Sequence, residues 1–131
     1  MTIVQAWSVA TDVQVTGCDN EIHIYATTLG SSVEVLSLVN TLNQPVNTTI
    51  HLPSKLQGGG NFTFLIVGLN WGGPWEFKVA FKNGNQVVWQ ASPSSPIPTS
   101  ADAPPGVAWT ASLGFAVPPF HFPEGTLRPK A

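Results

Sequence analysis

Charged residues are scarce in this sequence of 131 residues, where they make up 9% of the chain, with five Lys and Arg against seven Asp and Glu. A typical soluble domain carries about 25%. Five scattered basic residues cannot form the positive stripe that many phosphate contacts require, so nucleic acid and anionic membrane surfaces are not expected as partners. Ser, Thr, Asn and Gln together contribute 36 residues, which predicts a neutral, hydrogen-bonding surface.

Cysteine and long apolar runs are also nearly absent. Cys18 is the only cysteine, which excludes an internal disulfide and a cysteine-based zinc site. No apolar run approaches the ~18 residues of a membrane-spanning helix. The stretch from Met1 to Val15 lacks the basic region and the continuous apolar region of a secretory signal. We therefore expect a soluble protein without a signal peptide in this sequence, and its compartment stays unknown.

Alternation of apolar and polar residues is the dominant pattern that is present. Gly106 to Val117 predicts one long strand, with a core face made of Val107, Trp109, Ala111, Leu113, Phe115 and Val117. Trp75 to Lys82 alternates in the same way and is followed by Asn83-Gly84-Asn85 and by Gln86 to Ala91, which together predict a hairpin.

Weaker runs rich in Val, Ile, Thr and aromatic residues predict further strands between turn residues. They are Ile3–Val9, Val13–Thr16, Glu21–Thr28, Val33–Val39, Val46–Leu52 and Phe62–Leu69. The last run is apolar on both faces, which predicts a central strand covered on each side. No segment has a convincing helical period. We therefore predict an all-β fold, an antiparallel two-sheet β-sandwich of about eight or nine strands, immunoglobulin-like or jelly-roll-like.

Proline marks two segments outside the predicted strands. Residues 92–105 predict an extended crossover between the sheets, because proline cannot donate to a strand ladder. Residues 118–131 form a proline-rich tail, in which Phe120 and Phe122 alternate and are candidates for docking on the body. The length fits a single domain over residues 1–131.

The richest candidate site is the loop from Leu69 to Glu76, where glycines and a proline surround two tryptophans. An indole stacks on sugar C–H groups, while Asn and Glu side chains fix hydroxyls. The predicted ligand-binding residues are Asn70, Trp71, Trp75 and Glu76, with Asn83 and Asn85 of the neighbouring turn as outer candidates. The structural alternative is that Trp75 begins the core face of its strand and Trp71 closes one end of the sandwich.

Other polar residues do not form a recognisable motif. Asp12, Asp19, Asn20 and Glu21 match no calcium loop, and the three histidines show no metal-ligand spacing, so no metal and no cofactor are expected. Cys18 lies in Thr16-Gly17-Cys18-Asp19, a predicted turn, where an acidic neighbour raises its pKa. No nucleophile motif is present, so no catalytic residue is predicted.

Three functions remain as hypotheses. The first is a non-catalytic, lectin-like module that binds a neutral glycan or another small polar ligand, because five tryptophans occur on a chain with few charges. The second is a structural or self-assembling β-sandwich, and a homo-oligomer is compatible with both, since a net charge of −2 gives little self-repulsion. The third is a small enzyme with a dispersed site, which would require His23, Glu34 or Glu76 to converge in one cleft.

Overall fold

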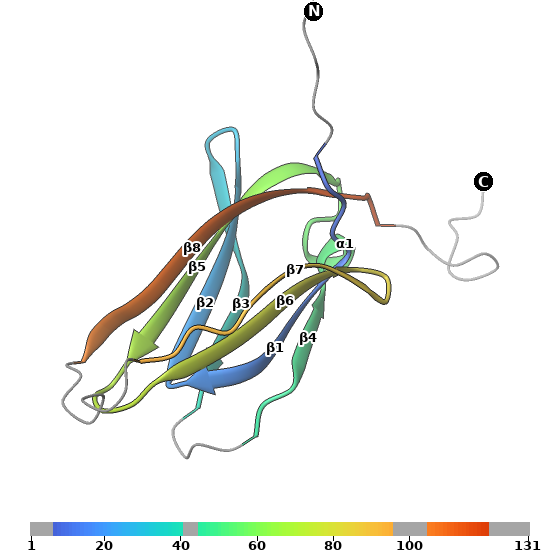
Figure 1. Cartoon of the computed structure of the whole chain (residues 1–131). Coiled ribbons are helices and arrows are strands. Elements are labelled where there is room, and N and C mark those ends of the chain that lie inside the picture. Colours follow the sequence, from blue (N-terminus) through green and yellow to red (C-terminus); the bar gives the residue numbers. More distant parts are fainter. Residues whose placement is uncertain (1–6, 41–44, 96–104, 121–131) are drawn as a thin grey trace, which may run out of the picture.

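The chain forms two antiparallel four-stranded sheets packed face to face in a computed structural model that describes residues 7–40, 45–95 and 105–120 (Figure 1). The predicted two-sheet sandwich is confirmed. The first sheet has the strand order β4-β1-β6-β7, and the second sheet has the order β3-β2-β5-β8. Among the described residues, no helix is long and apolar enough to cross a membrane.

Most strands begin and end close to the predicted turn residues. They are β1 (Asp12–Asp19), β2 (Glu21–Thr28), β3 (Ser31–Val39), β4 (Thr48–His51), α1 (Leu52–Lys55), β5 (Gly60–Asn70), β6 (Glu76–Asn83), β7 (Gln86–Ala91) and β8 (Gly106–Val117). The predicted hairpin is β6 and β7, and the predicted long strand is β8. The predicted strand Ile3–Val9 falls partly outside the described residues, and Val9 itself forms only an isolated parallel bridge with Ala116.

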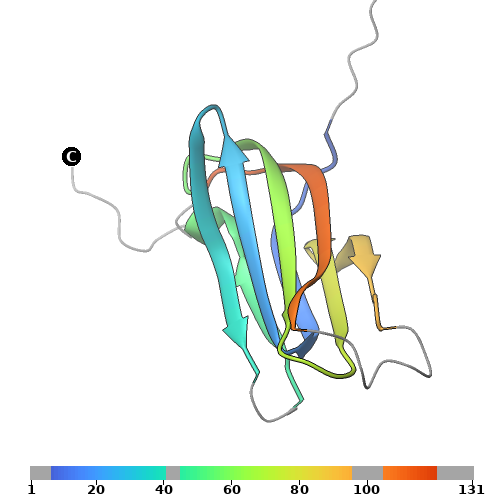
Figure 2. The same ribbon diagram turned by 90° about the vertical axis from the view of Figure 1, so that its left-hand side faces the viewer.

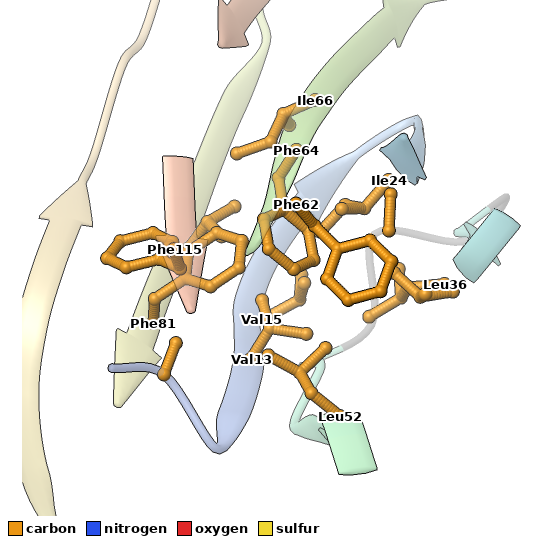
Figure 3. Close-up of a cluster of buried hydrophobic side chains, with 14 of the residues drawn as sticks. Val13, Val15, Ile24, Leu36, Leu52, Phe62, Phe64, Ile66, Phe81 and Phe115 are labelled. Atoms are coloured by element: carbon orange, nitrogen blue, oxygen red, sulfur yellow. The ribbon is translucent and has the colours of Figure 1, made fainter. Parts of the chain in front are cut away.

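Aromatic rings fill the space between the two sheets (Figure 3). Phe64 of β5 lies 5.1 Å from Phe81 of β6 and 6.1 Å from Phe115 of β8, measured between ring centroids. Phe77 and Phe81 of β6 are both fully buried. The alternation of each strand thus directs one set of side chains into a shared core, as period two requires.

Two β-bulges change the predicted patterns. Gly68 of β5 pairs with Trp109 of β8, but Leu69 pairs with Val107, so Ala108 is an extra residue on β8. Val107 is consequently 64% exposed, and its predicted place on the core face was wrong. On β1 the register also shifts, between Val15 and Gly17. The predicted turn at residues 16–19 was wrong, because these residues continue β1.

Two other predictions need correction. The run Val46–Leu52 was predicted as a strand, but only Thr48–His51 is β4, and Leu52 begins the one-turn helix α1. Pro53 occupies the first turn of α1, where its missing N–H costs nothing. β5 is central in its sheet, as predicted, but it is not covered on both sides: on the face turned away from the first sheet, Leu65 is 41% exposed.

The described parts of the proline-rich segments lie against the body. Ser95 of the predicted crossover is buried, and its N–H donates to the carbonyl of Trp75 over 3.0 Å. After β8, the N–H of Phe120 donates to the carbonyl of Gln57 over 3.0 Å. The tail is thus docked as far as Phe120, whereas Phe122 lies outside the described residues.

Candidate functional site

The predicted loop site is divided between buried and exposed residues. Asn70 is buried, and its side-chain amide donates to the carbonyl of Gly73 over 3.0 Å, which fixes the loop. Trp75 is half-buried against the core, with its ring centroid 5.8 Å from that of Phe77. The structural alternative is therefore the better description of Trp75. These two residues position the loop rather than offer a free surface.

The remaining predicted residues do not lie together. Glu76 is at the start of β6, whereas Asn83 and Asn85 are exposed beside the turn at its other end. Seven steps of about 3.3 Å place Asn83 roughly 23 Å along the strand from Glu76. That turn is held by Thr11, whose hydroxyl oxygen accepts the N–H of Gly84 over 2.8 Å. The structure does not bring the six predicted residues into one site.

Trp71 is the tryptophan of this loop that lies on an open surface. Its side chain is 45% exposed. Its backbone N–H donates to Oδ1 of Asn20 over 2.8 Å, and its indole N–H donates to Oε1 of Glu21 over 3.2 Å. Because Glu21 begins β2, these two bonds hold the indole against the second sheet, on the face turned away from the first sheet. We call this face the outer face.

A chain of polar side chains continues from Trp71 across the outer face. Oε2 of Glu21 lies 2.6 Å from Nε2 of His23, and Oε2 of Glu34 lies 2.7 Å from Nδ1 of the same ring. Glu21 and His23 alternate with the buried Ile22 and so share the outer face of β2. We call Glu21, His23, Glu34 and Trp71 the outer-face network.

The strand register explains how Glu34 reaches His23. Tyr25 of β2 is opposite Glu34 of β3, while Ile24 is opposite Leu36, so Val35 is an extra residue on β3. The bulge turns Glu34 onto the outer face beside its cross-strand neighbours. Without the extra residue, the alternation along β3 would turn Glu34 to the other face of the sheet. The network therefore depends on the bulge.

The distances fix the protonation of His23. A neutral imidazole has one N–H donor and one acceptor nitrogen, so it can donate to only one of two carboxylates. His23 faces a carboxylate oxygen at both nitrogens, which requires the imidazolium form when Glu21 and Glu34 are ionised. Partial burial alone would lower the pKa of His23, but the hydrogen bonds and charges of the two glutamates outweigh it and raise that pKa above its ordinary value. The bonds from His23 and Trp71 lower the pKa of Glu21.

Aromatic and aliphatic side chains lie next to the network on the outer face. The ring of Tyr25 lies nearly parallel to that of His23, at an angle of 16° and a centroid distance of 6.3 Å. Leu65 of β5 is directly opposite Tyr25. The lysines of the described residues lie elsewhere, on α1 and β6, so the charges on this face are those of the network.

A separate groove of about 330 Å³ opens at one end of the sandwich. Its lining residues are Thr16, Gly17, Cys18, Asp19, Asn40, Pro45, Val46 and Glu76. Burial and the charge of Glu76, which is opposite Asp19 across β1 and β6, raise the pKa of Asp19. Cys18 is buried, and burial followed by the charges of Asp19 and Glu21 raises the pKa of its thiol to about 12. The thiol is therefore protonated at neutral pH and is a poor nucleophile.

The three side chains that the enzyme hypothesis requires in one cleft converge only in part. His23 and Glu34 meet, but Glu76 lies in the groove, on the other sheet. Within the described residues, no three His, Cys, Asp or Glu side chains are arranged to hold a metal ion. Comparison with known proteins adds no assignment, since no family model, no curated protein and no solved structure gives a significant match to the chain.

The stabilisation by the outer-face network should depend on pH. The pKa of His23 is raised in the folded state, so its contribution is complete below about 6.5, the ordinary histidine value, and is lost as the pH rises through the folded pKa. The pKa of Glu21 is lowered, so its contribution is present above about 4.3 and is lost as the pH falls through the folded pKa. The network is therefore strongest between these two values.

We expect the difference in Tm between the wild type and His23→Gln to be largest near pH 5.5 and to shrink toward pH 9. It should amount to a few degrees at most, since ion pairs that are partly exposed contribute little. Thermal unfolding followed by circular dichroism across this range measures the difference. A difference that stays constant with pH would contradict the protonation argued for His23.

Proposed function

We propose that the protein is a non-catalytic carbohydrate-binding module whose site is Trp71 together with Glu21, His23 and Tyr25 on the outer face. The observation that carries the proposal is the orientation of Trp71, a 45% exposed indole whose N–H is held by Glu21. A fixed indole plane can stack on the C–H groups of a sugar without losing further conformational freedom. The outer-face network then supplies the polar contacts.

The chemistry of the face favours a neutral ligand over an acidic one. Two carboxylates and one imidazolium leave a net charge of −1 on the network, and the described lysines lie on other elements. Carboxylate oxygens accept hydrogen bonds from sugar hydroxyls and repel acidic sugars. The exposed side of Leu65, opposite Tyr25, extends the apolar area for C–H contact.

Trp71→Ala is expected to weaken glycan binding at least tenfold, which is about 1.4 kcal/mol. The experiment is an array of neutral oligosaccharides, including linear glucans, xylans and galactosides, followed by calorimetric titration of the best binder. Glu21→Gln should weaken binding less, because the indole keeps its backbone anchor on Asn20. Circular dichroism confirms the fold of each variant.

Two controls separate this site from other tryptophans and from the loop predicted by sequence. Trp7 is 43% exposed and packs over Gly114 of β8. Gly114 is paired with Thr63 of β5, which is about 20 Å along the strand from Leu69, the partner of Glu21. Trp7→Ala should leave binding unchanged, and so should Glu76→Gln in the groove. Binding that survives Trp71→Ala, or that is lost equally in Trp7→Ala, would contradict the proposal, as would a folded wild type that binds no glycan.

A further inference from the structure

In the part of the chain that the structure describes, β8 has an open edge beyond Ala116 that differs from the other three sheet edges. β3 and β7 are interrupted by bulges, next to Tyr25 and next to Lys82 respectively, and β4 has four residues and lies between Pro45 and Pro53. Such devices protect strand edges from pairing with other chains. β8 has its own bulge at Ala108, but it is regular from Trp109 to Val117, and none of its 12 residues is charged or proline. Within the described residues, it is therefore the least protected of the four sheet edges.

The edge of β8 already accepts a strand at its end. The N–H of Ala116 donates to the carbonyl of Ser8 over 2.8 Å, and its carbonyl accepts the N–H of Ala10 over 3.0 Å. Alternate residues of a strand direct their N–H and C=O groups to the same side. Thr110, Ser112 and Gly114 thus direct theirs to this same edge, next to the short segment that covers Ala116.

The core is also less well covered along this edge. Trp109, Ala111 and Leu113 of β8 are only half-buried, whereas their neighbours Phe64 and Ile66 on β5 are fully buried. In the first sheet, β7 carries the half-buried Trp89, and Figure 2 shows that β7 and β8 end their two sheets on the same side of the sandwich. A strand added to β8 would shield this row of apolar side chains.

We infer that β8 is a dimerisation edge, at which the β8 strand of a second copy pairs antiparallel to form one continuous eight-stranded sheet. A two-fold axis places identical residues of the two strands close to one another, so a charged edge would repel itself. β8 carries no charge, and the whole chain carries only −2. Antiparallel partners share faces, so Trp109, Ala111 and Leu113 meet their counterparts and the two cores become continuous.

Light scattering during size-exclusion chromatography, over a series of protein concentrations, tests this inference. The wild type is expected at twice the 13.9 kDa of one chain. Ser112→Pro removes an N–H that points to the open edge and leaves the β5 ladder intact, so this variant is expected to be monomeric. Ser112→Lys places two like charges close to the two-fold axis and should give the same result.

Thr63→Lys is the matched control, because Thr63 is an exposed residue of the same face on the inner strand β5, opposite Gly114. This variant should remain dimeric, with circular dichroism confirming that all variants are folded. A wild type that is monomeric at every concentration overturns the inference. A dimer that persists in both Ser112 variants, or that is lost equally in Thr63→Lys, overturns it as well.

Discussion

Phe64→Ala is expected to lower the free energy of unfolding by about 3–5 kcal/mol, the range for a buried phenylalanine. Phe64 is fully buried, and its ring lies 5.1 Å from Phe81, 6.1 Å from Phe115 and 6.3 Å from Phe62. These partners come from both sheets, so the lost ring leaves a cavity that no single element can close. Urea unfolding followed by tryptophan fluorescence measures the change.

The matched control for this prediction is Val87→Ala, because Val87 lies on the edge strand β7 and is 44% exposed. It should change stability by less than about 0.5 kcal/mol, as exposed substitutions usually do. Phe64→Leu should fall between the two variants. A loss below about 1 kcal/mol for Phe64→Ala would contradict the core described above, since burial on this scale cannot be so weak.

Gly68→Ala should destabilise the protein by about 1–3 kcal/mol, although it adds a single methyl group. A Cβ at this position would lie 2.8 Å from Cε2 and Cζ of Phe77. Phe77 is fully buried and cannot move without displacing its neighbours. Gly68 thus allows the ring of β6 to pack directly against the backbone of β5.

Gly114→Ala gives a comparison in which the steric contact is similar but the neighbour is free to move. A Cβ on Gly114 would lie 2.6 Å from Cζ3 of Trp7, which is 43% exposed and can turn toward solvent. We therefore expect a smaller loss than for Gly68→Ala. The double variant Gly68→Ala with Phe77→Leu should lose less than the sum of its parts. Equal losses at both glycines would refute the explanation.

The sequence was sufficient for the architecture because alternation and turn residues agreed along most strands. The β6–β7 hairpin and the bounds of β8 followed from period two and from Asn83-Gly84-Asn85. The bulges could not be read in this way: an extra residue such as Ala108 is specified by the pairing with β5, which is a long-range contact. Val107 was therefore assigned to the wrong face, although the strand itself was correct.

The site was less predictable for the same reason. Trp71 stood out because glycines and a proline surround it, but its neighbours in the loop turned out to face the core or the other sheet. Its polar partner Glu21 is 50 residues away in sequence, and the contact of His23 with Glu34 depends on the bulge at Val35. The available signal was that Glu21, His23 and Tyr25 alternate on one face of β2, which identified the strand face but not its partners.

The places where the described chain enters and leaves the sandwich have a practical consequence for assays. The first described residue, Trp7, packs over Gly114, and the last one, Phe120, bonds to Gln57. Both lie toward the end of the sandwich that holds α1, whereas Trp71 follows β5 at the opposite end (Figure 1). The described chain therefore enters and leaves the sandwich at the pole remote from Trp71. Protein immobilised on a sensor surface by this pole, for example through the exposed Lys55 of α1, would present the indole to the solution, and its Asn20 and Glu21 anchors would remain undisturbed.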